Sequence, residues 1–424
     1  MAAQCRTVED VVVTETASPC RFCGTELTLS FCDLGMTPLA NSYVEPAALR
    51  RGEMFYPLHA YVCSACLLVQ LEEFESPEHI FSDYAYFSSY SESWLEHCRR
   101  YTAAVVERFA IGSSHLVVEL ASNDGYLLRW FAERGVPVLG IEPAANVAAV
   151  ARLRGIETRV AFFGTALAAD LRDEGVIADL LIGNNVLAHV PALNDFVAGM
   201  TTLLAPSGVI TMEFPHLLRL VQGNHFDTIY HEHFSYFSFL VVRKVFAHHG
   251  LRVFDVDQVP THGGSLRIFA CHADNASLAD TDRVGTLLDD ERAAGLDRLD
   301  GYRDYPTRVR RTKAELVRFL VDARSAGASV AAYGAPAKGN TLLNYAGIGP
   351  DLIDFTVDRS PHKQGRYLPG TRIPILAPEA VAAARPDYLL ILPWNLRDEI
   401  ERDMAHVREW GGRFVLAIPE LTVL

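Results

Sequence analysis

The chain has 424 residues, of which half are apolar and 21% are charged, and its formal net charge is −14. This length predicts two or three globular domains with buried cores. The acidic balance and the lack of a basic block argue against a nonspecific nucleic-acid binder. No apolar run reaches the roughly 18 residues of a membrane span, and the first residues lack a signal-peptide pattern. We therefore expect a cytoplasmic protein without a membrane segment.

Two closely spaced cysteine pairs lie near the start of the chain, Cys20 with Cys23 and Cys63 with Cys66. Paired CxxC elements in a cytosolic chain are typical of zinc rather than of disulfides. Four thiolates fill a tetrahedral site and leave no open position, so we expect structural zinc. Redox-active or incidental cysteines are the alternative. We predict a zinc-binding module over residues 1–75.

A tyrosine-rich segment follows, and a helical pattern starts at Trp94. The tyrosines of this segment either border a core or cover a pocket, and the sequence does not decide between the two.

Residues 116–122 are predicted to form a buried strand that runs into a turn and then a helix. A second strand ends at Glu142, about twenty residues further on, where a carboxylate can accept hydrogen bonds from a ribose diol. A dinucleotide-binding fold would place GxGxxG in the first turn to hold a pyrophosphate, and that pattern is missing. S-adenosylmethionine (SAM) has no phosphate, so we favour SAM. The candidate cofactor-binding residues are Glu119, Ser122, Asn123, Asp124, Gly125, Glu142 and Asn184.

The strand predicted over residues 178–185 ends in Asn184 and Asn185, and His189 follows shortly after it. In sheets of the methyltransferase type, the residues after this strand border the methyl donor. The three side chains are therefore candidate pocket residues. The alternative for His189 is a structural histidine at a helix N-terminus.

The densest group of titratable side chains is Tyr230-His231-Glu232-His233, which aromatic residues flank. General acid–base catalysis uses such groups. A strand over residues 208–215 leads into this segment and so places it beyond the carboxyl edge of the sheet, where α/β sheets bind ligands. A structural knot of aromatic and histidine side chains is the alternative. The i, i+2 spacing of the histidines does not match the i, i+4 spacing of a zinc helix.

The last part of the chain is predicted to be a second α/β unit, reached through a charged and mostly helical stretch over residues 276–327. It opens with a strand, a glycine-containing turn that carries Lys338, and a helix, which is an anion-binding arrangement. A basic loop with Lys363 and Tyr367 either holds a second anionic group or is a surface loop with scattered charge.

The predicted fold is α/β with three parts. They are the zinc-binding module (1–75), a central SAM-binding Rossmann-like methyltransferase domain (76–275) and a C-terminal Rossmann-like domain (276–424). Within the central domain, residues 253–256 and 265–270 are expected to pair as antiparallel strands that close the sheet.

Together these motifs resemble the SAM-dependent C-methyltransferases that act on nucleotide-linked deoxysugars. The resemblance spans nearly the whole chain. It rests on the CxxC pairs, Val-Glu-Leu-Ala-Ser-Asn-Asp-Gly, Tyr-His-Glu-His-Phe-Ser-Tyr-Phe-Ser, Tyr-Gly-Ala-Pro-Ala-Lys-Gly-Asn and Ser-Pro-His-Lys-Gln-Gly-Arg-Tyr-Leu-Pro-Gly. It implies that the middle domain binds SAM, that the outer domains hold a dTDP-linked 4-keto sugar, and that the methyl group goes to C3 of the hexose.

The resemblance also implies roles for single residues. The C3 hydrogen lies α to the C4 ketone, so a base can remove it, and the resulting enolate attacks the methyl group. His233 is the expected base, with Tyr230 and Glu232 orienting it or the sugar. His189 and Asn185 are expected near the ketone. The family's pocket tyrosine corresponds to Tyr84, with Tyr86 and Tyr90 close by, and the expected substrate-binding residues are Asn185, Lys338, Lys363 and Tyr367.

Two other functions compete with this one. A nicotinamide-dependent sugar oxidoreductase would use the C-terminal unit, but GxGxxG is missing. A zinc-ribbon binding protein without catalysis would not need the density of His and Tyr around residue 231. The sequence leaves open the 3-substituent of the sugar, its C5 configuration, the stereochemistry at C3 and the oligomeric state; nothing in the composition requires an interface.

Overall fold

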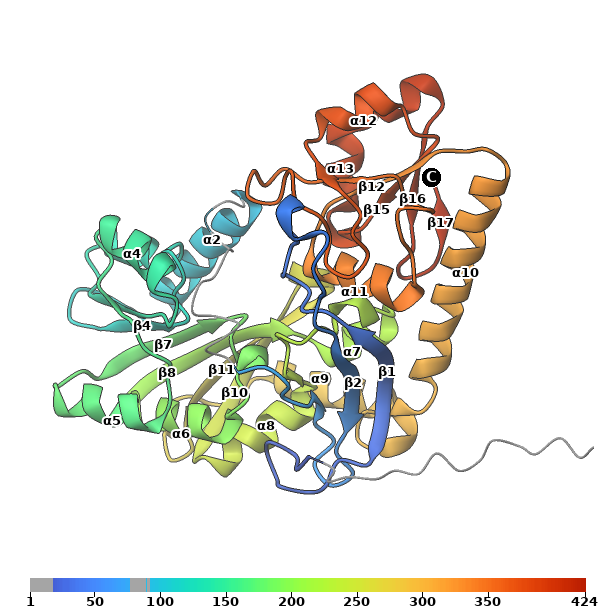
Figure 1. The fold of residues 1–424 in the computed structure, drawn as a ribbon. Helices are drawn as coiled ribbons and strands as arrows, with labels where there is room; N and C mark the ends of the chain where they lie inside the picture. The colour runs from blue at the N-terminus through green and yellow to red at the C-terminus, as the bar shows by residue number, and fades with distance from the viewer. Residues whose placement is uncertain (1–17, 77–88, 90–91) are drawn as a thin grey trace, which may run out of the picture.

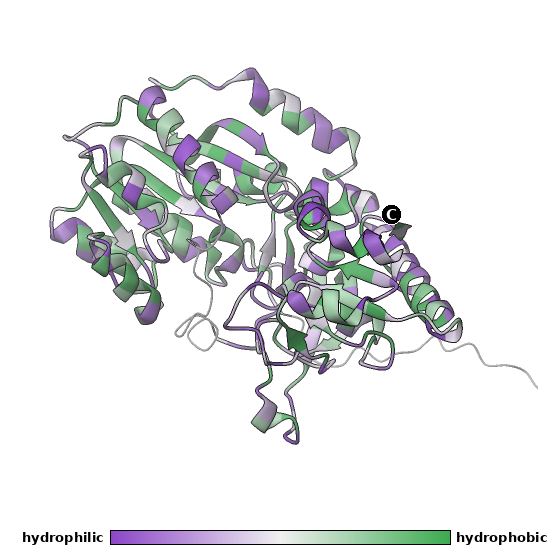
Figure 2. Ribbon diagram, turned by 90° about the horizontal axis from the view of Figure 1, so that it is seen from above, coloured by the Kyte–Doolittle hydropathy of each residue, from purple (hydrophilic) through white to green (hydrophobic). Residues whose placement is uncertain are grey.

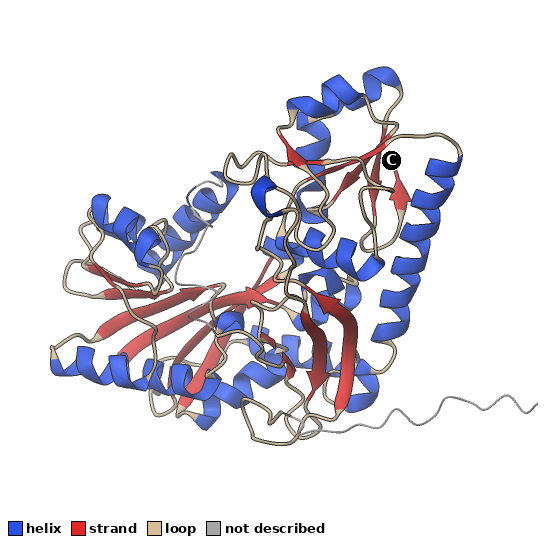
Figure 3. Cartoon of the chain, viewed as in Figure 1, coloured by secondary structure: helices blue, strands red, loops and turns tan. Residues whose placement is uncertain are grey.

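The computed structural model of the protein describes residues 18–76, 89 and 92–424 (Figure 1). The predicted Tyr84, Tyr86 and Tyr90 lie outside these residues. Within the described part of the chain, the strands form sheets of four, seven and six strands. Helices flank the two larger sheets (Figure 3).

The four-stranded sheet belongs mainly to the cysteine-containing module and is antiparallel throughout. Its order is β1-β2-β3-β9. The last strand, β9, comes from far along the chain. It pairs with β3 through Val69 opposite Tyr236 and Gln70 opposite Ser235. The segment that contains Tyr230-His231-Glu232-His233, called the His and Tyr cluster below, is thereby fastened to the N-terminal module. The strands are β1 (Leu29–Thr37), β2 (Tyr56–Val62), β3 (Val69–Leu71) and β9 (Ser235–Tyr236).

The seven-stranded sheet has the order β10-β11-β8-β7-β4-β5-β6. The chain moves outward from β4 through β5 to β6 and then returns to the other side of β4 for β7 and β8. This change of direction places a topological switch point between β4 and β7, where open α/β sheets bind ligands at the carboxyl ends of their strands. The strands are β4 (Val117–Leu120), β5 (Val138–Ile141), β6 (Thr158–Arg159), β7 (Ala178–Asn184), β8 (Leu204–Pro215), β10 (Leu251–Val259) and β11 (Ser265–His272).

The predicted antiparallel pair is confirmed, because β11 runs antiparallel to both β10 and β8. The other central strands pair in parallel. Successive side chains of a strand point to opposite faces of the sheet. Because helices cover both faces here, both sets of side chains are buried, which is why these strands are continuous apolar runs in the sequence. Val117 and Leu180 pack with α2 and α3, whereas Val118 and Leu181 pack with α5 and α6. The helices around this sheet are α2 (Glu92–Arg108), α3 (Leu128–Ala132), α4 (Ala145–Leu153), α5 (Thr165–Asp173), α6 (Leu193–Leu203) and α8 (Phe239–His248).

The six-stranded sheet forms the C-terminal α/β unit and has the order β14-β13-β12-β15-β16-β17. All of its pairings are parallel except that of β16 with β17. The strands are β12 (Val330–Tyr333), β13 (Thr356–Val357), β14 (Ile375–Leu376), β15 (Tyr388–Ile391), β16 (Arg413–Leu416) and β17 (Thr422–Val423), and the helices are α11 (Ala337–Ala346), α12 (Glu379–Ala384) and α13 (Arg397–Asp403).

The long helix α10 (Tyr305–Ser325) leads from the central region to the C-terminal unit and runs beside the N-terminal strands (Figure 1). Its first residue, Tyr305, stacks on Phe31 of β1 with ring centroids 4.7 Å apart. Hydrophobic and hydrophilic residues alternate along the outer helices (Figure 2), which is the pattern of helices with one buried face. Helix α10 packs against both β1 and the C-terminal elements α11 and β12, and so connects the three parts of the chain.

A buried carboxylate joins α9 (Asp282–Ala293) to the start of α8. Glu291 accepts the backbone N–H groups of Phe239 at 2.6 Å and Leu240 at 2.7 Å, and its Oε1 lies 2.7 Å from Nε2 of His216. An acceptor at a helix N-terminus satisfies donors that lack partners within the helix and interacts favourably with the helix dipole. Glu291 thus fixes the helix that follows the His and Tyr cluster.

Among the described residues, no helix is both long and apolar enough to cross a membrane.

Candidate active site

The four predicted cysteine ligands come together in the N-terminal module. The sulfur atoms of Cys20 and Cys66 are 3.6 Å apart, those of Cys23 and Cys63 are 3.5 Å apart, and all four lie within 4.8 Å of one another. A tetrahedron of Zn–S bonds of about 2.3 Å has edges of about 3.8 Å, so the sulfurs fit zinc. Each cysteine pair spans a tight turn followed by a left-handed residue, Gly24 (φ 75°) or Leu67 (φ 72°).

The turn after β4 has an unusual backbone. Alternate residues are left-handed, with φ of 55° at Ala121, 49° at Asn123 and 76° at Gly125. Left-handed conformations are costly for residues other than glycine, and such strain gathers at functional sites. Ser122 lies between them and packs against Gly140, where an added Cβ would stand 2.4 Å from the serine Oγ. The sequence indicated a ligand-binding turn but gave no sign that Ala121 and Asn123 take the place of glycines.

Glu142, at the end of β5, holds this turn in place. Its carboxylate accepts the backbone N–H of Asn123 at 2.9 Å and that of Ala144 at 2.8 Å. Burial raises the pKa of Glu142, and the two hydrogen bonds act in the opposite direction. The carboxylate thus stands at the predicted position beside the first turn. It has further acceptor capacity, because two carboxylate oxygens offer about four lone-pair sites.

Two other predicted acidic residues are placed differently. Glu119, inside β4, is fully buried beneath the turn, and burial raises its pKa well above the ordinary value. Asp124 is also buried, but it faces Arg154, whose Nη1 lies 2.9 Å from the Asp124 carboxylate, and it accepts a hydrogen bond from Ser89. Glu119 is therefore buried inside the strand that precedes the turn, and Asp124 ties the turn to the end of α4.

Asn184 ends β7 on the other side of the switch point. Its side-chain oxygen and nitrogen are buried and have no hydrogen-bond partner among the described residues. Leaving a buried amide unpaired is costly, so this position fits a polar ligand such as SAM. Asn185 follows with a left-handed backbone (φ 54°) and donates its backbone N–H to the Glu213 carbonyl at 2.7 Å.

Glu213, near the end of β8, centres a network that sequence reasoning missed. Its buried carboxylate lies 2.9 Å from Nε2 of His97, accepts the Thr261 hydroxyl at 2.9 Å and pairs with Arg267. Burial acts to raise its pKa, but the hydrogen bond from His97 and the charge of Arg267 lower it to about 2. The partners come from three separate segments, so no local pattern in the sequence indicated this carboxylate.

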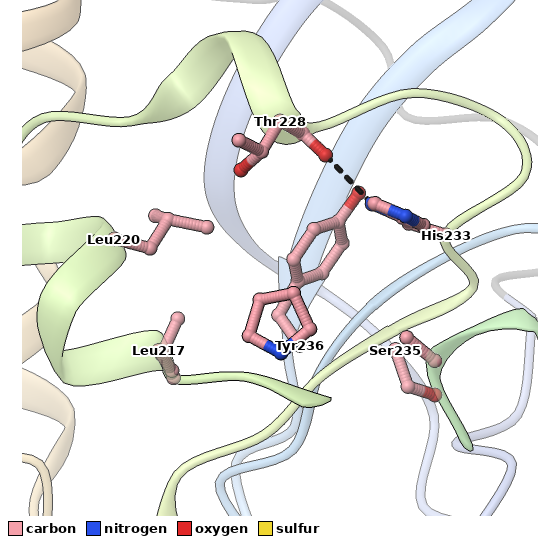
Figure 4. A pocket seen from close by; sticks show the side chains of 8 residues that line it. Leu217, Leu220, Thr228, His233, Ser235 and Tyr236 are labelled. Carbon is pink, nitrogen blue, oxygen red and sulfur yellow. Dashed lines mark hydrogen bonds between the residues drawn. The ribbon is translucent and has the colours of Figure 1, made fainter. Parts of the chain in front are cut away.

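The His and Tyr cluster begins after α7 (Leu217–Gln222) and the short helix η4 (Phe226–Thr228). His233 Nδ1 lies 2.9 Å from the Thr228 carbonyl oxygen (Figure 4). A carbonyl can only accept, so Nδ1 carries the hydrogen and Nε2 of the neutral ring keeps a free lone pair. The fold therefore presents His233 in the tautomer that a general base needs.

Two other predicted catalytic side chains lie next to this imidazole. The ring centroid of His233 lies 4.0 Å from that of Tyr230 and 4.7 Å from that of His189. Burial lowers the pKa of His233 well below the ordinary value, and the neighbouring His189 adds to the effect. Burial also lowers the pKa of His189 to about 4. Both imidazoles are therefore neutral at neutral pH.

The side chains of the other two residues of the cluster, His231 and Glu232, bond to different parts of the N-terminal module. His231 Nε2 lies 3.1 Å from the Pro57 carbonyl of β2, so His231 anchors the segment and is the structural histidine of the alternative interpretation. Glu232 is buried and accepts a 2.6 Å hydrogen bond from the side chain of Asn41 in the N-terminal module. Burial raises the pKa of Glu232 to about 7, and the hydrogen bond from Asn41 opposes the shift.

A small cavity lies next to His233 (Figure 4). Its volume is about 10 Å³, which is roughly the space that one water needs. A hexose therefore does not fit there. The lining residues are Ala188, Pro215, Leu217, Leu220, Thr228, His233, Ser235 and Tyr236.

Lys338 stands at the start of α11 and faces the central domain. Its Nζ donates to Asn395 Oδ1 at 2.6 Å and lies 4.4 Å from the ring centroid of Trp394. Trp394 in turn donates its indole N–H to Asp227 of η4 at 2.7 Å. The lysine thus lies within electrostatic reach of His233, and its charge contributes to lowering the pKa of that imidazole.

The other two predicted substrate-binding residues face the N-terminal module. Lys363 Nζ donates to the Ala335 carbonyl at 2.9 Å and lies 3.6 Å from the Asp358 carboxylate. Tyr367 exchanges two backbone hydrogen bonds of 2.9 Å with Val44. All three residues therefore line the junction between the C-terminal unit and the rest of the chain.

Three family domains match the chain in succession. They are a zinc binding domain over residues 20–81, a methyltransferase domain over 94–256 and a C-methyltransferase C-terminal domain over 260–419. The chain is also 38% identical over 405 residues to the C-methyltransferase NovU of Streptomyces niveus, which covers 96% of each protein. The chain belongs to the SAM-dependent C-methyltransferase family. This membership confirms the predicted family and decides against the oxidoreductase and the non-catalytic binding protein.

Likenesses to solved structures are weaker. A protein from Pyrococcus horikoshii is 16% identical and covers 47% of this C-methyltransferase and 99% of its own chain, with a TM-score of 0.37. The SAM-bound magnesium protoporphyrin IX methyltransferase of Synechocystis is 15% identical and covers 42% and 79%, with a TM-score of 0.33. Similarities of this size carry no conclusion about this enzyme. Membership of the family makes SAM its cofactor, and the match to a zinc binding domain together with the four-cysteine cluster assigns structural zinc.

Proposed function

We propose that this C-methyltransferase methylates C3 of a dTDP-linked 4-keto-deoxyhexose through an enolate. The observation that carries the proposal is the bond from His233 Nδ1 to the Thr228 carbonyl, which leaves Nε2 free to accept a proton. Methylation on carbon needs a carbon nucleophile. A hydrogen next to a ketone is the kind that a neutral imidazole can remove when the enolate oxygen is stabilised.

The residues around the base have complementary roles in this proposal. Nε2 of His233 takes the C3 proton, and the electron pair of the broken C–H bond passes to the enolate. His189, whose pKa burial lowers to about 4, and Asn185 would lie near the ketone, where the side-chain amide of Asn185 would donate an N–H hydrogen bond to the enolate oxygen. SAM, when bound, would supply an electrophilic methyl group. C3 of the enolate would bond to that carbon while the methyl–sulfur bond breaks, and the electron pair of that bond would stay on the sulfur of the departing S-adenosylhomocysteine.

The cofactor and the nucleotide sugar would occupy different parts of the junction. Glu142 and Asn184 flank the switch point and would hold the adenosine ribose and a polar group of SAM. Lys338 would contact the phosphates of the sugar nucleotide, with Lys363 and Tyr367 on the opposite side. Tyr84 lies outside the described residues and stays a prediction from the motif, as do the domain limits 1–75, 76–275 and 276–424 and the cytoplasmic location.

Mass spectrometry tests the proposal. The protein is incubated with SAM and either a dTDP-4-keto-2,6-dideoxyhexose or its 3-amino counterpart. A product heavier by one methyl group, without solvent deuterium at C3, is expected with one of the two sugars. If neither is methylated, exchange of the C3 proton without SAM separates the outcomes. Exchange would support the base and place the failure in methyl transfer, whereas no exchange with either sugar would contradict the proposed substrate.

A further inference from the structure

The N-terminal module contributes a side chain that contacts one of the predicted catalytic residues, Glu232. Asn41 lies in the loop over residues 38–45, directly after β1, and its Nδ2 donates to Glu232 Oε1 at 2.6 Å. The two residues are 191 positions apart in the chain. An ionised carboxylate only accepts hydrogen bonds, and a donor at this short distance favours the ionised form.

The C-terminal domain fixes this loop on both sides of Asn41. Asn340 of α11 donates its side-chain N–H to the Ala40 carbonyl at 2.6 Å. Tyr43 donates its hydroxyl to the Ala335 carbonyl at 2.6 Å. A polar side chain in a loop is normally mobile, so these contacts are what give Asn41 a defined position.

Helix α11 also contacts the segment that leads into the His and Tyr cluster. Thr341, the residue after Asn340, donates its hydroxyl to the Ile229 carbonyl at 3.1 Å, just before Tyr230. Asn340 and Thr341 are both buried. Consecutive residues of α11 therefore fix the loop that carries the donor and the segment that carries the acceptor, so the Asn41–Glu232 contact is set by all three parts of the chain.

We propose that Asn41 is a positioning residue that favours the ionised form of the Glu232 carboxylate and holds it in one orientation. This inference rests on the proposed function, in which Glu232 orients His233 or the sugar. It makes the zinc-binding module part of the active site rather than only a scaffold. Asn41 acts through Glu232 and is not itself assigned a contact with the reacting atoms.

The charged and titratable groups around Glu232 allow this role. Tyr43 lies within electrostatic reach of Glu232, and Lys363 and Asp358 lie near Tyr43. His189 bonds to the backbone of Glu232, and His233 is the next residue but is neutral. Burial raises the pKa of Glu232 to about 7, and the Asn41 hydrogen bond is the effect that lowers it. Loss of Asn41 should therefore raise the pKa of Glu232 further.

The test compares the full-length, zinc-loaded protein with Asn41→Ala and Asn41→Asp. The neighbouring Ser42→Ala is the control, because Ser42 is exposed on the same loop. With Asn41→Ala, the acid limb of the pH profile of kcat/KM should move up by about one pH unit. A carboxyl group half ionised at pH 7 would then be about one-tenth ionised, so activity at pH 7 should fall about fivefold. Asn41→Asp should shift the limb further, because like charges disfavour ionisation.

A structural role would give a different pattern. It would lower the melting temperature or the zinc content and leave the pH limb in place, and that result would overturn the inference. A second criterion is the double variant with Glu232→Gln. If Asn41 acts only through Glu232, Asn41→Ala should cause no further loss in that background. A full additional loss would also overturn the inference.

Infrared titration separates this inference from the proposed function. The band of the protonated Glu232 carboxyl is obtained as the difference between the wild type and Glu232→Gln, in the absence of any sugar. Asn41→Ala should shift its titration to higher pH even if the wild type methylates neither test sugar. An unshifted band would overturn the inference whatever the reaction, whereas a shifted band without turnover would contradict only the proposed substrate.

Discussion

His233→Asn is the most direct test of the candidate base. The side-chain amide of asparagine reaches about as far as the imidazole Nδ1, so it can keep the hydrogen bond to the Thr228 carbonyl, which is 2.9 Å from Nδ1 in the wild type. It has no atom in place of Nε2. The variant therefore removes the base and preserves the local fold.

The expected loss can be estimated from the surroundings of His233. A positioned general base contributes about 10²- to 10⁴-fold, or roughly 3 to 5 kcal/mol of barrier. Burial and the neighbouring His189 lower the pKa of His233 well below the ordinary value. A weaker base gains less from the proton transfer, so we expect the lower half of this range, about 10²- to 10³-fold in kcat. The same depressed pKa keeps the ring neutral and active at and above neutral pH, so its protonation should reduce activity only under acidic conditions.

The assay has three readouts. Calorimetry should give an unchanged Kd for SAM, methyl transfer should fall by the stated factor, and exchange of the C3 proton with deuterated solvent should be lost even without SAM. His231→Asn is the matched control. His231 lies two residues away but is directed toward the Pro57 carbonyl, so this variant should keep kcat within about threefold, although it should be less stable.

Two results would contradict the assignment of His233 as the base. One is proton exchange in His233→Asn at close to the wild-type rate, which would mean that another group removes the proton. The other is an equal loss of kcat in both histidine variants, which would mean that the effect comes from disruption of the segment and not from loss of the base.

Three further predictions concern the metal and the stability of the fold. Metal analysis should find one zinc per chain. Cys63→Ser should lose both the zinc and the turnover, because β9 pairs with the module that the zinc stabilises. Full turnover without zinc would contradict this prediction. Glu291→Gln should lower the free energy of unfolding by about 3 kcal/mol in a denaturation experiment, since an amide cannot accept from all of the donors around the buried carboxylate; a change below about 1 kcal/mol would contradict the described network. Burial raises the pKa of Asp227 from 3.8 to about 6. Between pH 4 and 6 the folded state therefore retains a proton that the unfolded state has released. The free energy of unfolding should fall by up to about 3 kcal/mol over this range. Asp227→Asn should flatten this pH dependence, and an unaltered slope would show that other groups cause it.

Much of the architecture could be predicted because its signals are local. The cysteine pairs are short motifs, and the buried strands are continuous apolar runs between turn residues. The meeting of His189 with His233 was also accessible, because both follow strands whose carboxyl ends share one edge of the sheet.

The remaining features depend on contacts between distant segments. Nothing near Asn41 marks it as the partner of Glu232, since the two residues meet only when three domains have assembled. The left-handed Ala121 was hidden for a different reason, because composition predicts glycine at such a position. Asn340 and Thr341 belong to the motif that was interpreted as an anion-binding turn because of Lys338. In the structure, these two residues make contacts between domains instead.

The pairing of β9 with β3 has a consequence for how such enzymes can be recombined. A fragment that ended near residue 75 would leave the backbone donors and acceptors of Val69 and Gln70 without the strand that normally pairs with them, and an open strand edge invites association with other chains. A chimera that joined this N-terminal module to a foreign methyltransferase domain would face the same problem. It would need a donor segment that supplies a matching strand at the place of Ser235 and Tyr236, so the unit that can be exchanged includes the strand that directly follows Tyr230-His231-Glu232-His233.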